Sequence, residues 1–457
     1  MHRRLTASLA VAVLALTVLV WPEPRGRAAT VNQVSGTVNF DATTMVGPDE
    51  ILQFDPAQNT TLEVAGNLVI EGALEMKPNP GVQHILRFVG VNEAAFAGEG
   101  MSVLESDRGL WVMGAGRLDL LGQAKTGWNR TGVDPTWTST DELKVSPTAV
   151  GDYGASGFAT FSLGGSVPRA DASVPAAEVI NLTRSVTIEG TAPGRSHVFI
   201  MSSSPQSIRF ARFRHMGPRQ VEGGATAGVL GRYPVHFHMM GEGARGSIVE
   251  GSVVTQSGNR AFVTHASNGV TLRGNVAYDI VETPFWWDET EPSNDIVWDG
   301  NFAGYVRSDP PLQHSTVAGF RIGMGVGNVA TGNVAAGIVG TGNCAGFQWG
   351  PEGDPQWTFN NDLAHNVRCH GARVWRNDSV NVLVQDYVAY RNGESGINHG
   401  AYGNSFQYAN VYLFQNADFG IINHTFSKAI RPPTEQQTWS CVTVAGSPTA
   451  IKIMHSG

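Results

Sequence analysis

The stretches Val388-Ala389-Tyr390-Arg391-Asn392-Gly393 and Tyr412-Leu413-Phe414-Gln415-Asn416-Ala417 lie 24 residues apart and share one pattern of apolar, aromatic and turn-forming residues. Gly396-Ile397 recurs as Gly420-Ile421 at the same distance. Self-similarity at a period of roughly 20–50 residues is typical of solenoids. A period of this size with short β-forming runs predicts the coils of a right-handed parallel β-helix, with about three strands in each coil. We therefore expect an all-β, pectin-lyase-like fold.

The composition also favours many short strands. Gly accounts for 55 of the 457 residues, and charged residues make up only 15%. Gly weakens helices, and long surface helices need charged outer faces. Asn concentrates from Asn259 onward, where it can occupy left-handed corners or form amide ladders between coils. The patterns of leucine-rich repeats and β-propeller blades, the competing repeat folds, are absent.

The N-terminus has the order of a secretory signal. Basic residues precede the apolar run from Leu5 to Val20, and a small-residue site ends at Ala28,. The run is short for a membrane span, although a membrane anchor is the alternative. We expect an exported chain, cleaved near Ala28, with no membrane span afterwards. Removing residues 1–28, with four Arg and one Glu, leaves 27 basic and 38 acidic residues, a balance that disfavours a nucleic-acid partner.

Changes in composition divide the rest of the chain into four parts. Residues 29–135 alternate apolar and polar positions between Gly-rich turns, whereas residues 136–177 are rich in Thr, Ser, Pro, Gly and Ala,. We expect a Gly-rich β domain at 29–135, a linker or excursion at 136–177, the β-helix at 178–430 and C-terminal strands at 431–457.

Three His and two acidic residues make the most specific pattern. His236 and His238 alternate with Val235 and Phe237, so a strand would turn both His to one face,. His265 lies one coil later, and the 23-residue offset places Asp288, followed by Glu289, one coil beyond it. Such a patch suits acid–base catalysis. A metal site is the second possibility, and a stack of hydrogen-bonded polar side chains is the third.

Basic and aromatic residues near this patch are candidates for binding an acidic sugar. Arg forks match carboxylates, and aromatic faces stack on sugar rings. Solvent-facing ion pairs for the Arg residues and core packing for the Trp residues are the structural alternatives. The candidate substrate-binding residues are Arg212, Arg214, Arg232, Arg260, Trp286 and Trp287.

Two of the three cysteines fit the repeat. Cys344 and Cys369 are 25 residues apart, about one coil, so they could meet across adjacent coils. A disulfide is plausible in an exported chain. The alternative is that they are buried small apolar side chains.

Longer segments resemble a known family. Leu110-Trp-Val-Met-Gly-Ala-Gly-Arg-Leu-Asp-Leu-Leu-Gly122 resembles the eight-glycine domain of the animal cell-migration-inducing, hyaluronan-binding proteins. Leu230-Gly-Arg-Tyr-Pro-Val-His-Phe-His-Met-Met-Gly241 and Val263-Thr-His-Ala-Ser-Asn-Gly-Val270 resemble the β-helix of the same family. The resemblance implies a secreted or surface protein that binds and depolymerises hyaluronan. The residues that match its motifs are Arg232, His236, His238, His265, Asp288 and Glu289.

Together with these patterns, the resemblance implies a secreted, hyaluronidase-like protein whose partner is a uronate-containing extracellular polysaccharide. Asp288 or Glu289 would act as acid or nucleophile, and His265 and His238 would orient substrate or relay protons. A glycoside hydrolase is our first expectation and a polysaccharide lyase the second. The alternative is a non-catalytic glycan-binding or adhesion protein. No cofactor is implied with certainty, and calcium or zinc is possible, with His236, His238 and His265 as the metal ligands.

Overall fold

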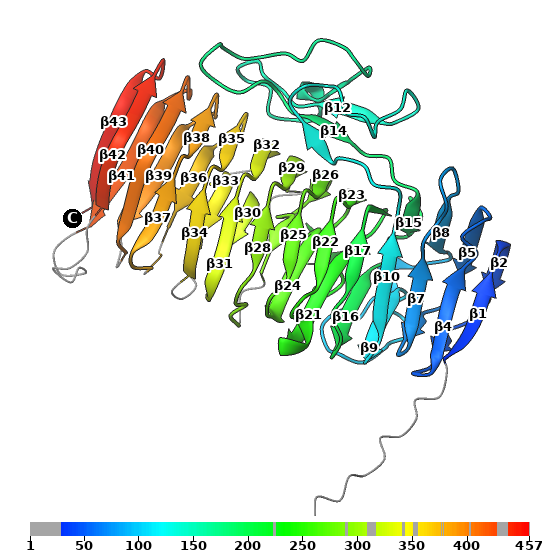
Figure 1. The fold of residues 1–457 in the computed structure, drawn as a ribbon. Helices are drawn as coiled ribbons and strands as arrows, with labels where there is room; N and C mark the ends of the chain where they lie inside the picture. The colour runs from blue at the N-terminus through cyan, green and yellow to red at the C-terminus, as the bar shows by residue number, and fades with distance from the viewer. Residues whose placement is uncertain are drawn as a thin grey trace, which may run out of the picture.

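The computed structural model describes residues 29–222, 225–287, 291–308, 317–340, 343–350, 355–375, 377, 379–401, 404–426 and 437–456. The predicted signal peptide lies outside these residues. The chain winds into a right-handed parallel β-helix, as the repeat predicts. Its coils stack side by side from β1 (Thr30–Val34) at one end to β43 (Thr449–Ser456) at the other (Figure 1).

Each coil contributes strands to three parallel sheets, two of which join at β40. Sheet 1 contains β1, β4 (Glu50–Phe54), β7 (Ala73–Met76), β10 (Arg117–Leu121), β17 (Ser207–Arg209), β22 (Ile248–Glu250), β25 (Thr271–Arg273), β28 (Val297–Asp299), β31 (Gly325–Thr331), β34 (Pro355–Asn360), β37 (Val382–Gln385), β40 (Phe406–Phe414) and β42 (Gln437–Ala445). Sheet 2 contains β2 (Gly36–Phe40), β5 (Thr60–Val64), β8 (His84–Phe88), β15 (Val186–Glu189), β18 (Ala211–Arg214), β23 (Val253–Ser257), β26 (Val276–Val281), β29 (Phe302–Arg307), β32 (Val334–Val339), β35 (Leu363–His365) and β38 (Val388–Tyr390), and then runs into β40.

Sheet 3 carries the candidate site. It contains β3 (Thr44–Val46), β6 (Leu68–Ile70), β9 (Leu110–Gly114), β16 (Val198–Ser202), β21 (Val235–Gly241), β24 (Phe262–Ser267), β27 (Phe285–Trp286), β30 (Ala318–Ile322), β33 (Ala345–Trp349), β36 (His370–Val374), β39 (Ser395–Ala401), β41 (Phe419–Phe426) and β43.

The strand register confirms the repeat. Val388 pairs with Tyr412 and Ala389 with Leu413, a spacing of 24 residues. Phe262 pairs with Phe285 after 23 residues. Each of these pairs joins equivalent positions of adjacent coils, so the sequence period is the length of one coil.

The interior is filled by aligned apolar side chains. Phe262, Phe285, Phe320 and Phe347 stack in one row, with successive ring centroids 5.1, 4.5 and 4.9 Å apart. All four are at most 1% exposed. Burying a large apolar side chain contributes about 1.5–3 kcal/mol, so this row stabilises the coils that position the neighbouring candidate site.

Asn residues form the ladders expected from their abundance. The side-chain amide of Asn275 donates to Asn301 Oδ1 at 3.0 Å, and that of Asn301 donates to Asn333 Oδ1 at 3.0 Å. Asn333 in turn donates to Asp362 Oδ1 at 2.9 Å. The ladder satisfies buried amides at one corner of four coils, although its last member is a carboxyl group.

The Gly-rich segment differs from the expectation of a separate domain. Its strand β7 pairs with β10, and β10 continues the same parallel ladder to β17. In sheet 3, β9 likewise pairs with β16. Residues 30–121 are therefore the first coils of a continuous solenoid. Regular alternation and Gly turns suit a β-helix coil as well as an independent β domain.

The segment expected as a linker is an excursion that lies against the solenoid (Figure 1). Its four short strands form an antiparallel sheet in the order β11, β14, β12, β13. Its apolar residues Phe158, Val174 and Ile180 pack against Val276 and Phe302 of sheet 2. The excursion extends beyond residue 177, because it includes β14. The bounds are β11 (Trp128–Asn129), β12 (Leu143–Val145), β13 (Ala159–Thr160) and β14 (Val179–Asn181), with the 3-10 helix η2 (Ala155–Gly157).

A few smaller elements complete the described chain. β19 (Arg219–Glu222) and β20 (Ala225–Gly228) form an antiparallel hairpin, and η1 (Glu93–Ala95) and η3 (Glu242–Ala244) are single 3-10 turns. The C-terminal strands β42 and β43 add a further coil to the solenoid. None of the helices in the described residues has the length and apolar character needed to cross a membrane.

Candidate functional site

Three histidines meet on the outward side of sheet 3, away from the core. Val235 and Phe237 of β21 point into the core, so alternation turns His236 and His238 to the other side. β21 pairs in parallel with β24, and the register sets His238 beside His265. His236 is fully buried, whereas His238 and His265 are half-buried. The structure therefore brings the three predicted His together at a partly accessible face.

Nitrogen atoms of the three rings face one another. His236 Nδ1 lies 2.9 Å from the carbonyl oxygen of Gly231. Because a carbonyl oxygen only accepts, Nδ1 carries the proton and Nε2 keeps its lone pair. Nε2 lies 3.3 Å from His238 Nδ1, which lies 3.2 Å from His265 Nδ1. One nitrogen of each ring lies within 4.8 Å of the others, so the cluster could hold a metal ion.

Burial controls the charge of these rings. It lowers the pKa of His236 well below its ordinary value, and a charge on His238 lowers it further. Burial, followed by the charges of His265 and Arg232, lowers the pKa of His238 to about 4. Both rings are therefore neutral at pH 7. A neutral imidazole can accept a proton or bind a metal.

Aromatic side chains surround the cluster but are themselves buried. Trp286 and Trp287 are only 3% and 1% exposed, and they pack with Tyr233 and Val263 on this side of the sheet. The Cζ atom of Arg260 lies 3.6 Å from the ring centroid of Trp286. The Trp faces therefore pack within the protein, which corrects the expectation that they stack on sugar rings. Of this group, half-buried Arg260 is the side chain that reaches the surface.

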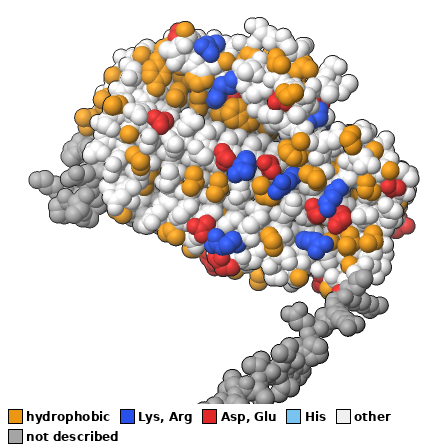
Figure 2. All heavy atoms as spheres, viewed as in Figure 1, with side chains coloured by type: hydrophobic (Ala, Val, Ile, Leu, Met, Phe, Trp, Pro, Cys, Tyr) orange, Lys and Arg blue, Asp and Glu red, His pale blue; other side chains and the backbone are white. Residues whose placement is uncertain are grey.

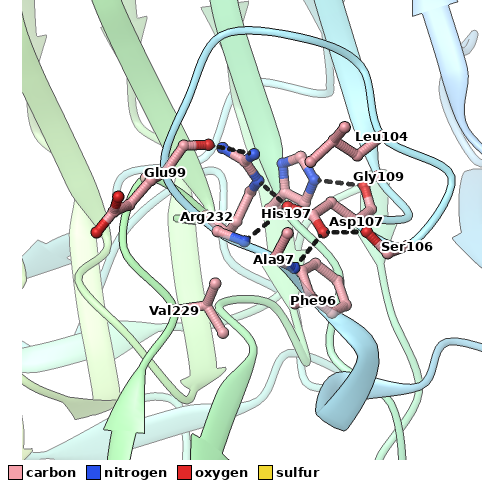
Figure 3. A network of polar contacts seen from close by, with 12 residues as sticks. Phe96, Ala97, Glu99, Leu104, Ser106, Asp107, Gly109, His197, Val229 and Arg232 are labelled. Carbon is pink, nitrogen blue, oxygen red and sulfur yellow. Dashed lines mark hydrogen bonds and ion pairs between the residues drawn. The ribbon is translucent and has the colours of Figure 1, made fainter.

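Arg232 also differs from its expected substrate-binding role, because its side chain is fully buried. Its Nε donates to Asp107 Oδ2 at 2.8 Å, and a terminal nitrogen donates to the Glu99 carbonyl at 2.8 Å (Figure 3). The guanidinium lies 4.7 Å from the Trp111 ring centroid. Arg232 thus holds the loop that carries Glu99 and Asp107 against the coil of the three His.

The carboxyl group of Asp107 is the centre of this network. Burial alone would raise its pKa, but hydrogen bonds from Ser106 and the Ala97 amide, with the charge of Arg232, lower the pKa overall. The Ser106 hydroxyl and the Ala97 amide both donate to Oδ1, each at 2.7 Å (Figure 3). His197 Nε2 lies 2.9 Å from the backbone carbonyl oxygen of Asp107. The network positions the loop rather than a ligand.

Arg212 and Arg214 lie on sheet 2, not on the face with the three His. Arg212 pairs with Glu142 at 3.2 Å and Arg214 with Glu189 at 2.6 Å. Basic and acidic side chains similarly lie next to one another over the face of the solenoid in Figure 2. The expected role of these two residues beside the His cluster is therefore not supported. The repeat gives the length of a coil but does not show which sheet a run of residues joins.

The predicted acidic residues Asp288 and Glu289 lie outside the described residues. The register before them runs from Phe262 paired with Phe285 to Val263 paired with Trp286. Their placement one coil beyond His265 therefore stays a prediction.

Cys344 and Cys369 form a disulfide between adjacent coils, with their Cα atoms 5.2 Å apart. Cys441 is an exposed free thiol.

Sequence reasoning missed the residues that support the site from a distance. Asp107 and Tyr233 carry no motif of their own, and Asp107 lies 125 residues from Arg232. Tyr233 packs on His236 with ring centroids 4.7 Å apart. It stands within the segment that resembles the family, so its position next to the His pair was the available signal.

One part of the chain is similar to a known family. Residues 196–320 match the family model described as the CEMIP beta-helix. The match covers β21 and β24, which carry the three His. A G8 domain-containing protein of Dictyostelium discoideum is 30% identical over 136 residues, 29% of this chain and 11% of that protein. The human cell surface hyaluronidase CEMIP2 is 26% identical over 136 residues, 25% of this chain and 9% of that protein. These matches thus span about a tenth of each relative.

The solved structures that match this chain share little sequence with it. The A-module of the mannuronan C-5 epimerase AlgE6 of Azotobacter vinelandii is 12% identical, with a TM-score of 0.36 over 93% of this chain and 90% of that one. The Agl-KA catalytic domain is 9% identical, with a TM-score of 0.39 over 94% of this chain and 62% of that one.

Proposed function

We propose that the protein acts outside the cell on a uronate-containing polysaccharide, which it binds and cleaves at the outward side of sheet 3 around His238 and His265. The observation that carries the proposal is the CEMIP beta-helix match over residues 196–320, because that segment contains the three-His cluster. The human relative is named a cell surface hyaluronidase. An N-terminal segment with the order of a secretory signal supports an extracellular site of action.

The accessible groups at this face suit an acidic sugar. His238 and His265 are half-buried, so a ligand can reach them, and His238 is neutral at pH 7 because burial lowers its pKa to about 4. A neutral imidazole keeps one N–H, which can donate a hydrogen bond to a sugar oxygen and so orient the substrate. Arg260 adds a cation beside Trp286 that can pair with a uronate carboxylate,. In this proposal Asp288 or Glu289 supplies the acid or nucleophile.

Hydrolysis is our first candidate reaction and elimination the second. Hydrolysis would use paired carboxyl groups and release new reducing ends. Elimination would use a base next to the uronate and leave an unsaturated ring that absorbs ultraviolet light. Products of the two reactions therefore differ in one absorbance measurement.

The experiment is a panel of hyaluronan, chondroitin, heparosan, pectate and alginate, incubated with the purified chain and analysed by product size. We expect one uronate-containing polymer to be shortened by the wild-type protein and by His424→Ala, but not by His265→Ala. His424 is a matched control because it is also a half-buried His of sheet 3, in β41. Retention of a polymer without shortening would instead identify a glycan-binding or adhesion protein. If the protein neither retains nor shortens any of the five polymers, the proposal is wrong.

A further inference from the structure

We propose that His236, His238 and His265 form a binding site for a first-row divalent metal ion of borderline softness, with zinc as the best-matched member. The three residues come from two adjacent coils of sheet 3, so the fold rather than a flexible loop holds them together. This proposal goes beyond the proposed glycan chemistry, because metal binding can be measured without any substrate.

The nitrogen spacing is the first argument. Zinc binds His nitrogens at about 2.0–2.1 Å in tetrahedral geometry, which places two ligand nitrogens about 3.4 Å apart. His238 Nδ1 lies 3.3 Å from His236 Nε2 and 3.2 Å from His265 Nδ1. The two neighbouring pairs are therefore already at the separation that a shared metal ion requires. The three nitrogens lie within 4.8 Å of one another, so binding one ion requires the rings to turn until the third pair also closes to about 3.4 Å.

Hydrogen bonding explains the cluster less well than a metal does. His236 Nε2 has a lone pair, because its Nδ1 proton goes to the Gly231 carbonyl. His238 Nδ1 faces this lone pair and also faces His265 Nδ1. In the plane of the ring, an imidazole nitrogen has either one proton or one lone pair. His238 Nδ1 therefore cannot donate to His236 Nε2 and also accept from His265 Nδ1. A single cation would accept lone pairs from all three nitrogens.

Histidines elsewhere on sheet 3 show the contrast. His399 Nδ1 lies 2.7 Å from the Tyr408 hydroxyl and its Nε2 lies 3.0 Å from Asn404 Oδ1. The Asn404 oxygen accepts from Nε2, and the Tyr408 hydroxyl can donate to Nδ1, so both ring nitrogens have complementary partners, which is the usual way to satisfy a buried His. In the three-His cluster, by contrast, His238 Nδ1 faces a nitrogen of His236 at 3.3 Å and a nitrogen of His265 at 3.2 Å.

The surroundings are those of a metal ligand set. Metal-binding His residues usually donate their other ring N–H to a carbonyl or carboxylate, which fixes the ring orientation. His236 does this with Gly231, and Phe199 packs on both His236 and His238, with ring centroids 5.3 and 4.7 Å apart. Three imidazoles select zinc, copper or nickel over calcium, which takes oxygen ligands. The half-buried positions of His238 and His265 leave the outer side of the ion open to water or a ligand.

The test uses the full chain without a polyhistidine tag, stripped of metal with a chelator and titrated with zinc. We expect one zinc ion per chain by calorimetry and elemental analysis. Replacing a residue that only hydrogen-bonds to a metal ligand already weakens binding by about 10–100-fold. Removing a ligand in His238→Ala should weaken zinc binding by at least as much. His424→Ala should bind like wild type. Cobalt titration should give the visible absorption of a tetrahedral site in wild type and not in His238→Ala.

A second variant keeps the test valid if His238→Ala is misfolded. His265→Asn removes one imidazole at the half-buried edge of the cluster, and its circular dichroism and thermal unfolding without metal will show whether it is folded. Zinc should raise the melting temperature of wild type and His424→Ala but not that of folded His265→Asn. Stoichiometric zinc binding that survives both cluster substitutions, or no zinc binding by wild type, would overturn the proposal.

Discussion

The guanidinium of Arg232 donates to the carboxylate of Asp107 at 2.8 Å, and neither side chain is exposed to solvent. The two residues are 125 positions apart in the sequence. Their pair joins the loop before β9 to the segment that leads into β21, the strand of His236 and His238. The loop that covers the coil next to the His cluster is therefore fixed by a buried charge pair.

Removing one partner of this pair should strongly destabilise the protein. In Asp107→Ala the Arg232 charge would stay buried without its carboxylate, which typically costs about 3–5 kcal/mol. We expect a loss of this size in the free energy of unfolding measured with urea. Glu242→Ala is the control, because the Glu242–Arg245 pair is exposed, with side chains 67% and 48% accessible, and exposed pairs contribute little. Equal effects of the two substitutions would contradict a special role for the buried pair.

The carboxyl group at the end of the Asn ladder should make stability fall with rising pH. Burial raises the pKa of Asp362 to about 8, so the folded protein keeps a proton that the unfolded chain loses near pH 4. Stability from this group is therefore complete below about pH 4 and decreases as the pH rises toward 8. Asp362 Oδ2 is also buried and has no hydrogen-bond partner within the described residues.

Asp362→Asn should remove this pH dependence while keeping an acceptor for Asn333. At pH 9 we expect the variant to be about 1–3 kcal/mol more stable than wild type, the cost of an unsatisfied buried group. The measurement is urea unfolding at pH 5 and pH 9. Asp386→Asn, at a half-buried position that accepts from Asn410 at 3.1 Å, is the control for an Asp-to-Asn substitution outside the ladder. A wild-type protein whose stability is the same at both pH values would disprove the prediction.

The excursion should separate from the solenoid in acid. Burial alone would raise the pKa of Glu178, but the charges of His365 and Arg130, with hydrogen bonds from His365 and Ser146, lower it to about 2. A lowered carboxyl pKa stabilises the fold above its unfolded value and loses this effect as the pH falls from about 4.5 toward 2. Limited proteolysis by an acid-active protease should therefore cut residues 122–182 first as the pH falls.

Glu178→Ala should make the excursion sensitive to proteolysis already at pH 7. It leaves His365 and Arg130 without the carboxylate that they contact at 2.9 Å. Glu142→Ala tests a half-exposed carboxylate that also links the excursion to sheet 2, through Arg212 at 3.2 Å, and should resist proteolysis like wild type. Cleavage elsewhere in the chain before the excursion would contradict the prediction.

The disulfide should stabilise the C-terminal coils. Cys344 and Cys369 close a loop of 25 residues, and cross-links of this size contribute about 3 kcal/mol. We expect replacement of both by Ser to lower the free energy of unfolding by about that amount. Cys441→Ser, at an exposed free thiol, should have no measurable effect. Alkylation of the purified chain with and without prior reduction, followed by mass measurement, will show whether the disulfide is present.

Local patterns in the sequence were enough to predict the coil and part of the site. The 23–24-residue period sets the register, and one coil length brings His238 next to His265. The alternation around Phe237 also determines that His236 and His238 share a face. These features depend on neighbours in the chain or on a constant offset, which a single sequence contains.

Other features depend on contacts that the period does not encode. The Arg232–Asp107 pair crosses from one coil to a loop of another, and the Glu178–His365 pair crosses from the excursion to sheet 2. Three sheets share one coil length, so the sequence did not show that Arg212 would lie on a different sheet from His238. Burial of Trp286 likewise follows from packing against Tyr233 and Arg260, not from its own pattern.

The most direct test of the central claim is the size distribution of hyaluronan after incubation with the full chain, compared between wild type, His265→Ala and His424→Ala. We predict that wild type and His424→Ala shorten the polymer and that His265→Ala, folded by circular dichroism, does not. If His265→Ala shortens hyaluronan at the wild-type rate, the three-His face of sheet 3 is not the site of action. If hyaluronan stays intact in all three samples, the same comparison with chondroitin, heparosan, pectate and alginate decides whether any uronate polymer is a substrate, and intact polymers throughout would contradict the claim.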